Sequence, residues 1–173
     1  MLDLLSKISA SVASSELRDW VVYLLSNVPG LPPIIQTIHI LAIAAVMGSV
    51  VFVNLRILGL AVPGQDPSEM IMRLLPFTFW ALLPLVCSGL VFVIARPNRY
   101  FFNPVFGIKF ALLVPVLVLT WCLYSLRKQE PEFWERSAPR RRLARVIALI
   151  SLPLWLGVMM AGRWIAYADY LFW

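Results

Sequence analysis

Residues 34–60 read IIQTIHILAIAAVMGSVVFVNLRILGL, and this stretch decides the fold class. A helix needs about 20 consecutive apolar residues to cross a bilayer, so the stretch is long enough to span one. It also contains the single histidine of the chain, His39. Histidine is costly in hydrocarbon and is usually retained there for a function. The sequence therefore predicts a membrane helix that carries one chemically distinctive side chain near its start.

The composition extends this prediction to the whole chain. Of its 173 residues, 61% are hydrophobic and 14% are charged, whereas a soluble domain is about 45–50% apolar and about 25% charged. The apolar residues gather in four blocks, 34–60, 71–95, 105–126 and 143–164. We predict one domain, residues 1–173, with an all-α architecture: a polytopic membrane four-helix bundle.

The two ends of the chain differ from the four blocks. Residues 1–30 carry apolar residues on one helical face and lack the basic start and unbroken apolar core of a signal peptide. We predict an amphipathic interfacial helix there, followed by a turn at Pro29 and Gly30. For residues 164–173 we expect an interfacial helix or a continuation of the fourth span. The interfacial aromatic belts are expected to hold the tryptophans near span ends: Trp20, Trp80, Trp134, Trp164 and Trp173.

Lysine and arginine residues set the expected orientation. The net charge is +6, and nine of the 15 basic residues fall on the side of the loop between the third and fourth spans. Because short cytoplasmic loops are enriched in these residues, we place loop 127–142 in the cytoplasm and both termini outside. This topology explains the charge without a nucleic-acid partner. Binding of anionic lipid or an acidic partner is an alternative role for the loop.

Other polar side chains share one side of the predicted first span with His39. At 100° per residue, Gln36, Met47 and Asn54 lie on one flank of the histidine. Polar side chains in membrane helices face the bundle or a cavity rather than lipid. We therefore expect Gln36, Met47 and Asn54 to line a pocket beside His39, which is roughly 7–8 Å below the outer interface.

Residues of other spans are predicted at the same depth. Met159 and Met160 lie just inside the outer end of the fourth span, and Lys109 and Arg163 lie at the same face. This set suits haem b, because imidazole ligates iron, a thioether can be the second axial ligand and cations pair with propionates. A copper(I) site from His39 and methionine is one alternative. The other is a histidine that hydrogen-bonds across helices and holds no cofactor.

Several short segments, taken in order, resemble a bacterial four-helix membrane family of unknown function. The segments are QTIH at 36–39, GS at 48–49, NLRILG at 54–59, LP at 75–76, ARP at 95–97, NP at 103–104 and AGRWIAY at 161–167. The family commonly has aspartate where this chain has Asn54. The resemblance implies a location in the bacterial inner membrane.

The histidine, glycine and arginine of the first span are also distantly similar to two better-known membrane groups. These groups are the CopD-like copper-resistance proteins and the HemJ-type protoporphyrinogen oxidases, which hold haem through histidine. The resemblance rests on one helix. It implies ligand chemistry at His39, and no enzymatic reaction is carried over from it.

These observations lead to one functional prediction and two alternatives. We predict a haem-b-binding inner-membrane protein, a small redox or assembly subunit, with His39 as axial ligand. The alternatives are a cofactor-free membrane scaffold or accessory subunit of a larger complex, and copper handling. Expected partners are the lipid bilayer and either another membrane protein or a second copy of the chain. The sequence has no HExxH, GxSxG, phosphate-loop or dinucleotide motif, so we assign no enzyme class.

Overall fold

The structure, a computed structural model, describes residues 2–130 and 132–167. Within these ranges it is helical and has no strand, which confirms the predicted all-α class. The elements are α1 (Leu2–Ala13), α2 (Glu16–Asn27), α3 (Leu31–Leu58), α4 (Pro67–Ala95), α5 (Pro97–Phe101), α6 (Pro104–Gln129), α7 (Ala138–Trp164) and the 3₁₀ helix η1 (Ile165–Tyr167). Four of them, α3, α4, α6 and α7, are long and apolar enough to cross a membrane. The chain is a polytopic four-helix bundle.

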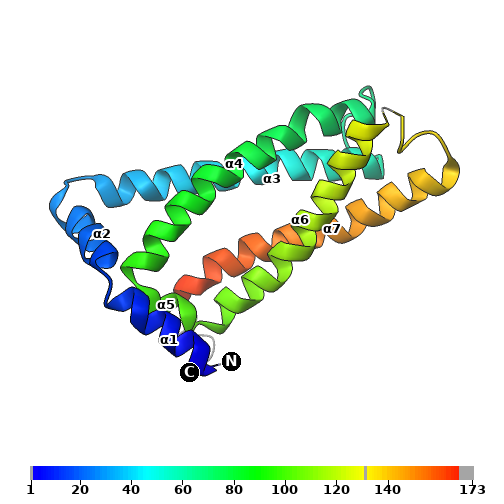
Figure 1. Ribbon diagram of the computed structural model, residues 1–173. Coiled ribbons are helices and arrows are strands. Elements are labelled where there is room, and N and C mark those ends of the chain that lie inside the picture. Colours follow the sequence, from blue (N-terminus) through cyan, green and yellow to red (C-terminus); the bar gives the residue numbers. More distant parts are fainter. Residues whose placement is uncertain (1, 131, 168–173) are drawn as a thin grey trace.

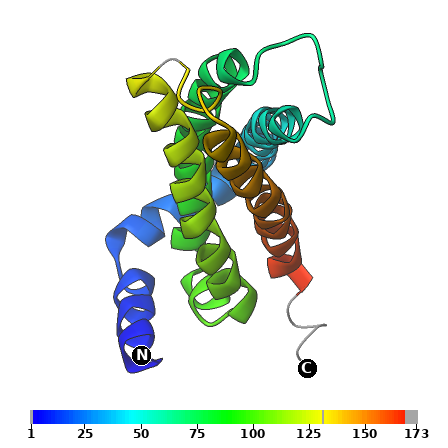
Figure 2. The same cartoon turned by 90° about the vertical axis from the view of Figure 1, so that its right-hand side faces the viewer.

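The four long helices form a ring. Helix α3 packs against α4 and α7, and α6 packs against the same two helices from the other side. The helices converge at the end that holds the α3–α4 and α6–α7 connections and spread apart toward the other end, where α1, α2 and α5 lie (Figure 1). Figure 2 shows the same spread from the side. We call these the loop end and the terminal end of the bundle.

Each long helix starts outside the apolar block that predicted it. Helix α3 begins at residue 31 rather than 34, and α7 begins at 138 rather than 143. Polar capping explains the extension of three helices: Asp66, Asn103 and Ser137 each accept a hydrogen bond from a backbone N–H in the first turn of α4, α6 and α7. Helix α3 follows Gly30, which forms no side-chain cap. Proline occupies the first turn of all four helices, where its missing N–H costs nothing. Hydropathy therefore indicates which residues can lie in the membrane, whereas capping residues indicate where the helix begins.

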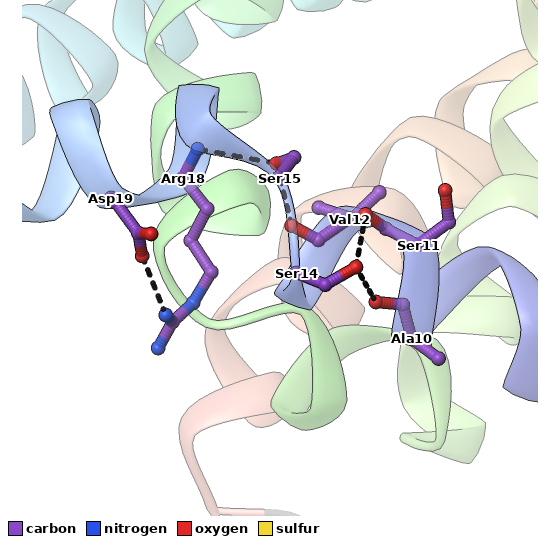
Figure 3. A network of polar contacts seen from close by, with 7 residues as sticks. All are labelled: Ala10, Ser11, Val12, Ser14, Ser15, Arg18 and Asp19. Carbon is purple, nitrogen blue, oxygen red and sulfur yellow. Dashed lines mark hydrogen bonds and ion pairs between the residues drawn. The ribbon is translucent and has the colours of Figure 1, made fainter.

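The predicted N-terminal helix is two helices. Ser15 is the N-cap of the second helix, because its hydroxyl accepts a hydrogen bond from the Arg18 backbone N–H at 3.2 Å. The Ser14 and Ser15 hydroxyls donate back to carbonyls of α1 at 3.0 Å and 2.7 Å (Figure 3). These local bonds break the helix at a point where the apolar periodicity continues. The predicted amphipathic segment is therefore bent in the middle.

The core of the bundle combines apolar and polar contacts. Val50, Ile71, Val116 and Ala148 bring one buried residue from each long helix into the main cluster. A hydrogen bond lies within the same core: the Trp155 Nε1–H donates to the Thr120 hydroxyl at 3.2 Å and joins α7 to α6. Such a bond between buried partners fixes the rotation of the two helices, because a turned helix would leave a donor unpaired in an apolar medium.

One tryptophan lies where the sequence did not place it. Trp134 was expected in an interfacial belt, and this prediction is wrong: the side chain is 2% exposed. Its Nε1–H donates to the Leu123 carbonyl at 3.0 Å, and its ring meets Phe133 edge-on. The loop after α6 folds back over the loop end and buries the indole. Trp20, Trp80 and Trp164 are exposed, while Trp173 and the rest of the segment 168–173 lie outside the described residues.

We predict that Thr120→Val destabilises the bundle by about 1–3 kcal/mol, because it leaves the Trp155 donor buried and unpaired. The free energy of unfolding, measured by titration with a denaturing detergent, checks this. Thr37→Val is the matched control, since Thr37 is exposed on α3. Adding Trp155→Phe to Thr120→Val should recover part of the loss. Equal stabilities of the two valine variants would contradict the role given to this bond.

Candidate functional site

The His39 side chain lies between α3 and α4. Its ring is partly buried, and its Nδ1 atom is 2.8 Å from the Ser88 hydroxyl of α4. His39 is eight residues after the start of α3, and Ser88 is seven residues before the end of α4. The two antiparallel helices therefore bring these residues to one depth near the terminal end.

Ser88 determines which imidazole nitrogen carries the proton. The Ser88 hydroxyl has one proton, and it donates toward the Pro84 carbonyl at 2.5 Å, with the Leu85 carbonyl at 3.2 Å. With its proton used in this way, the oxygen is left to accept from His39, and we infer that Nδ1–H is the donor. In the neutral ring this arrangement leaves the lone pair on Nε2. Fixing the tautomer through the second nitrogen is how proteins prepare a histidine for metal ligation.

Two further residues of α4 support the ring. A Cβ placed on Gly89 would be 3.6 Å from His39 Cε1, so the imidazole lies directly against the glycine backbone. The Phe92 ring approaches His39 edge-on, with centroids 6.1 Å apart and planes at 85°. The His39 ring is thus contacted by three residues on one face of α4: Ser88, Gly89 and Phe92. The sequence analysis did not predict any of these three residues. The pattern that could have indicated them is a serine followed by a glycine in an apolar span at the depth of His39.

Lys109 and Gly162 bring the other two long helices to this part of the bundle. The Lys109 Nζ atom lies 3.8 Å from the point where a Cβ on Gly162 would stand, so the amine of α6 crosses to α7 over a glycine. Lys109 is five residues after the start of α6, so it lies near the terminal end, as His39 does. Of the predicted site, the structure therefore places His39 and Lys109 at the same end of the bundle.

The remaining predicted residues lie differently. Met159 and Met160 are 39% and 43% exposed, so neither thioether is enclosed by the bundle. Arg163 is exposed and donates to the Tyr167 hydroxyl at 3.3 Å. Gln36 is exposed as well, whereas Met47 is partly buried.

Asn54 is the most deeply buried of the predicted pocket residues, at 3% exposure. Its amide donates to the Val50 carbonyl at 2.8 Å and reaches the Ser151 hydroxyl at 3.4 Å. It lies 15 residues beyond His39 on α3, which is roughly 22 Å along the helix. Asn54 therefore belongs to the core near the loop end and not to the surroundings of His39.

The chain belongs to a family of unknown function. The model of this family, DUF6644, matches residues 10–168, which include all four long helices. The match confirms the predicted membership of an uncharacterised family. No curated protein and no solved structure matches the chain.

The ligand chemistry of the site is that of a single imidazole. Among the described residues, no group of three or more His, Cys, Asp or Glu side chains lies together as a metal site would require. A bare copper or zinc ion usually needs three or four protein ligands. A haem iron receives four nitrogens from its own macrocycle and needs one axial residue from the protein. A lone histidine with a prepared Nε2 lone pair is suited to the second case.

We predict that ¹⁵N NMR of histidine-labelled protein, recorded without cofactor at about pH 8.5 so that the ring is neutral, shows the proton on Nδ1. The chain has one histidine, so the signal needs no assignment. Ser88→Ala should shift the spectrum toward a mixture of tautomers. Ser49→Ala, which removes another buried hydroxyl, should leave it unchanged. A proton found on Nε2 in the unmodified protein would contradict the arrangement.

Proposed function

We propose that this protein binds haem b in the membrane, with His39 Nε2 as the axial ligand. The observation that supports the proposal is the hydrogen bond from Nδ1–H to Ser88, because it orients the ring and leaves Nε2 as the basic atom. Haem supplies one-electron redox chemistry. A small redox or assembly subunit is the role that such a site suits.

The residues around His39 fit the group on one side of the iron. Gly89 adds no side-chain bulk beside the ring, and the Lys109 ammonium provides a cation of the kind that pairs with a propionate. Arg163, on the following turn of α7 from Met159 and Met160, is a second candidate for that pairing. Because both methionines are substantially exposed, we propose a five-coordinate iron with His39 as its protein ligand.

A cofactor-free scaffold is the second candidate, and the same hydrogen bond favours it. A bond between His39 and Ser88 joins α3 to α4 and satisfies both side chains in an apolar medium. In that role the histidine would hold the helix pair together, as one part of an accessory subunit. Copper handling receives less support, because the methionines that it needs are exposed.

We predict that protein purified from haem-replete cells shows a Soret band of the high-spin, five-coordinate type, and that His39→Ala removes it. Ser88→Ala should weaken haem binding by about 10–100-fold, which is typical of the loss of a partner that orients a ligand. Ser49→Ala is the matched control and should bind as the unmodified protein does. Titration of the purified protein with haem measures all four.

Three outcomes would argue against the proposal. A colourless protein that takes up no haem on titration would favour the scaffold, and a lower stability of His39→Ala would then support it. Copper found by elemental analysis without a Soret band would favour copper handling. A low-spin, six-coordinate spectrum that Met159→Leu or Met160→Leu abolishes would replace the five-coordinate iron with a histidine–methionine pair.

We also propose that the protein lies in the bacterial inner membrane with loop 127–142 in the cytoplasm and both termini outside. The loop end carries Arg56, Arg73 and the basic residues between 127 and 145, which supports this orientation.

Labelling of single cysteines tests the orientation. In a background with Cys87 and Cys122 replaced, we expect Ser14→Cys to react with a membrane-impermeant maleimide in cells whose outer membrane has been permeabilised. Gln129→Cys should react after the inner membrane is also opened. Both positions are exposed and lie at opposite ends of the bundle. The reverse pattern would invert the topology.

A further inference from the structure

A basic pocket lies at the terminal end, away from His39. It forms where the corner between α1 and α2 meets the corner between α4 and α5, and its lining includes Arg18, Arg96, Pro97, Asn98 and Arg99. Two segments far apart in the sequence thus contribute three arginines to the lining of one pocket.

The pocket is held together by contacts that leave its charge available. The Ser9 hydroxyl, which is buried, donates to the Asn98 side-chain carbonyl at 2.6 Å and fastens α1 to α5. Arg18 pairs with the exposed Asp19 carboxylate at 3.2 Å (Figure 3). Arg99 donates to the Ala166 carbonyl at 3.4 Å. A solvent-exposed ion pair contributes little, so Arg18 can turn from Asp19 to another anion.

The depth of the pocket identifies its surroundings. Arg96 directly follows Ala95, the last residue of the membrane-spanning helix α4. Helix α2, which carries Arg18, exposes the apolar side chains of Leu17, Trp20 and Tyr23. An amphipathic helix with such residues lies at the boundary between headgroups and acyl chains. The pocket is therefore at the level of phospholipid headgroups.

We propose that this pocket binds the phosphate of an anionic phospholipid headgroup. Arginine is suited to this ligand, because its planar fork donates two parallel hydrogen bonds to phosphate oxygens. Three arginines against one carboxylate leave a net positive charge at the site. The exposed apolar side chains of α2, the helix that carries Arg18, provide a surface for the acyl chains. The bound lipid would fasten the surface helices α1 and α2 to the bundle.

Native mass spectrometry in a neutral detergent tests the proposal with phosphatidylglycerol and phosphatidylcholine as probes. We expect the intact protein to retain phosphatidylglycerol in preference to phosphatidylcholine. The triple variant R18Q/R96Q/R99Q should bind phosphatidylglycerol roughly 10–100-fold more weakly, on the usual contribution of basic residues at a membrane surface. The control R56Q/R73Q/R145Q removes the same charge from the loop end, outside loop 127–142, and should bind normally.

Arg96→Gln alone is the second variant, because its side chain is exposed and its substitution spares the contacts of Arg18 and Arg99. It should lower the affinity several-fold while the helical circular dichroism is unchanged. The proposal is overturned if the pocket variants bind as the intact protein does, or if the loop-end control loses as much affinity. It is also overturned if millimolar inorganic phosphate displaces the lipid, because the occupant would then be a free anion.

Discussion

The hydrocarbon around the four long helices offers no hydrogen bonds, so a polar side chain in a span is stabilised by a partner within the bundle, which the buried Asn54 Oδ1 and Thr78 Oγ1 atoms lack among the described residues. Three contacts meet this requirement between helices: His39 with Ser88, Asn54 with Ser151, and Trp155 with Thr120. Together they join α3 to α4, α3 to α7 and α7 to α6. Because each bond forms at one rotation of its helices, the polar pairs determine how the apolar faces are set against one another.

The same constraint explains how much of the fold the sequence could predict. Length and hydropathy were enough for the four spans, since any helix that crosses a bilayer needs them. They could not predict that Trp134 is buried, because its burial depends on how the loop after α6 folds back onto α6. Nor could apolar periodicity predict the break at Ser14 and Ser15, where side-chain hydroxyls compete with the helix for backbone groups.

The candidate site was predictable in depth but not in rotation. Counting residues from the span ends brought His39 and Lys109 to one level, and in the structure both lie near the terminal end. The same count placed Met159 and Met160 at that level. Depth does not fix the rotation of a helix about its axis, however, and both methionine side chains are substantially exposed. The position of Ser88 follows from the packing of α4 against α3, which no single-helix pattern contains.

The loop end contains two carboxyl groups with opposite responses to acidity. Burial and the neighbouring Asp66 side chain raise the pKa of Glu135, which accepts from the Ser68 backbone N–H. Its contribution to stability is thus complete below the usual glutamate pKa and is lost as the pH rises through the raised value. Hydrogen bonds from Arg136 and Arg140 lower the pKa of Glu130, whose contribution is lost as the pH falls through the lowered value. Acidification therefore first strengthens the link between the two connecting loops and then, at lower pH, weakens the pairing within the α6–α7 loop, so that these two groups favour the loop end most near the usual glutamate pKa.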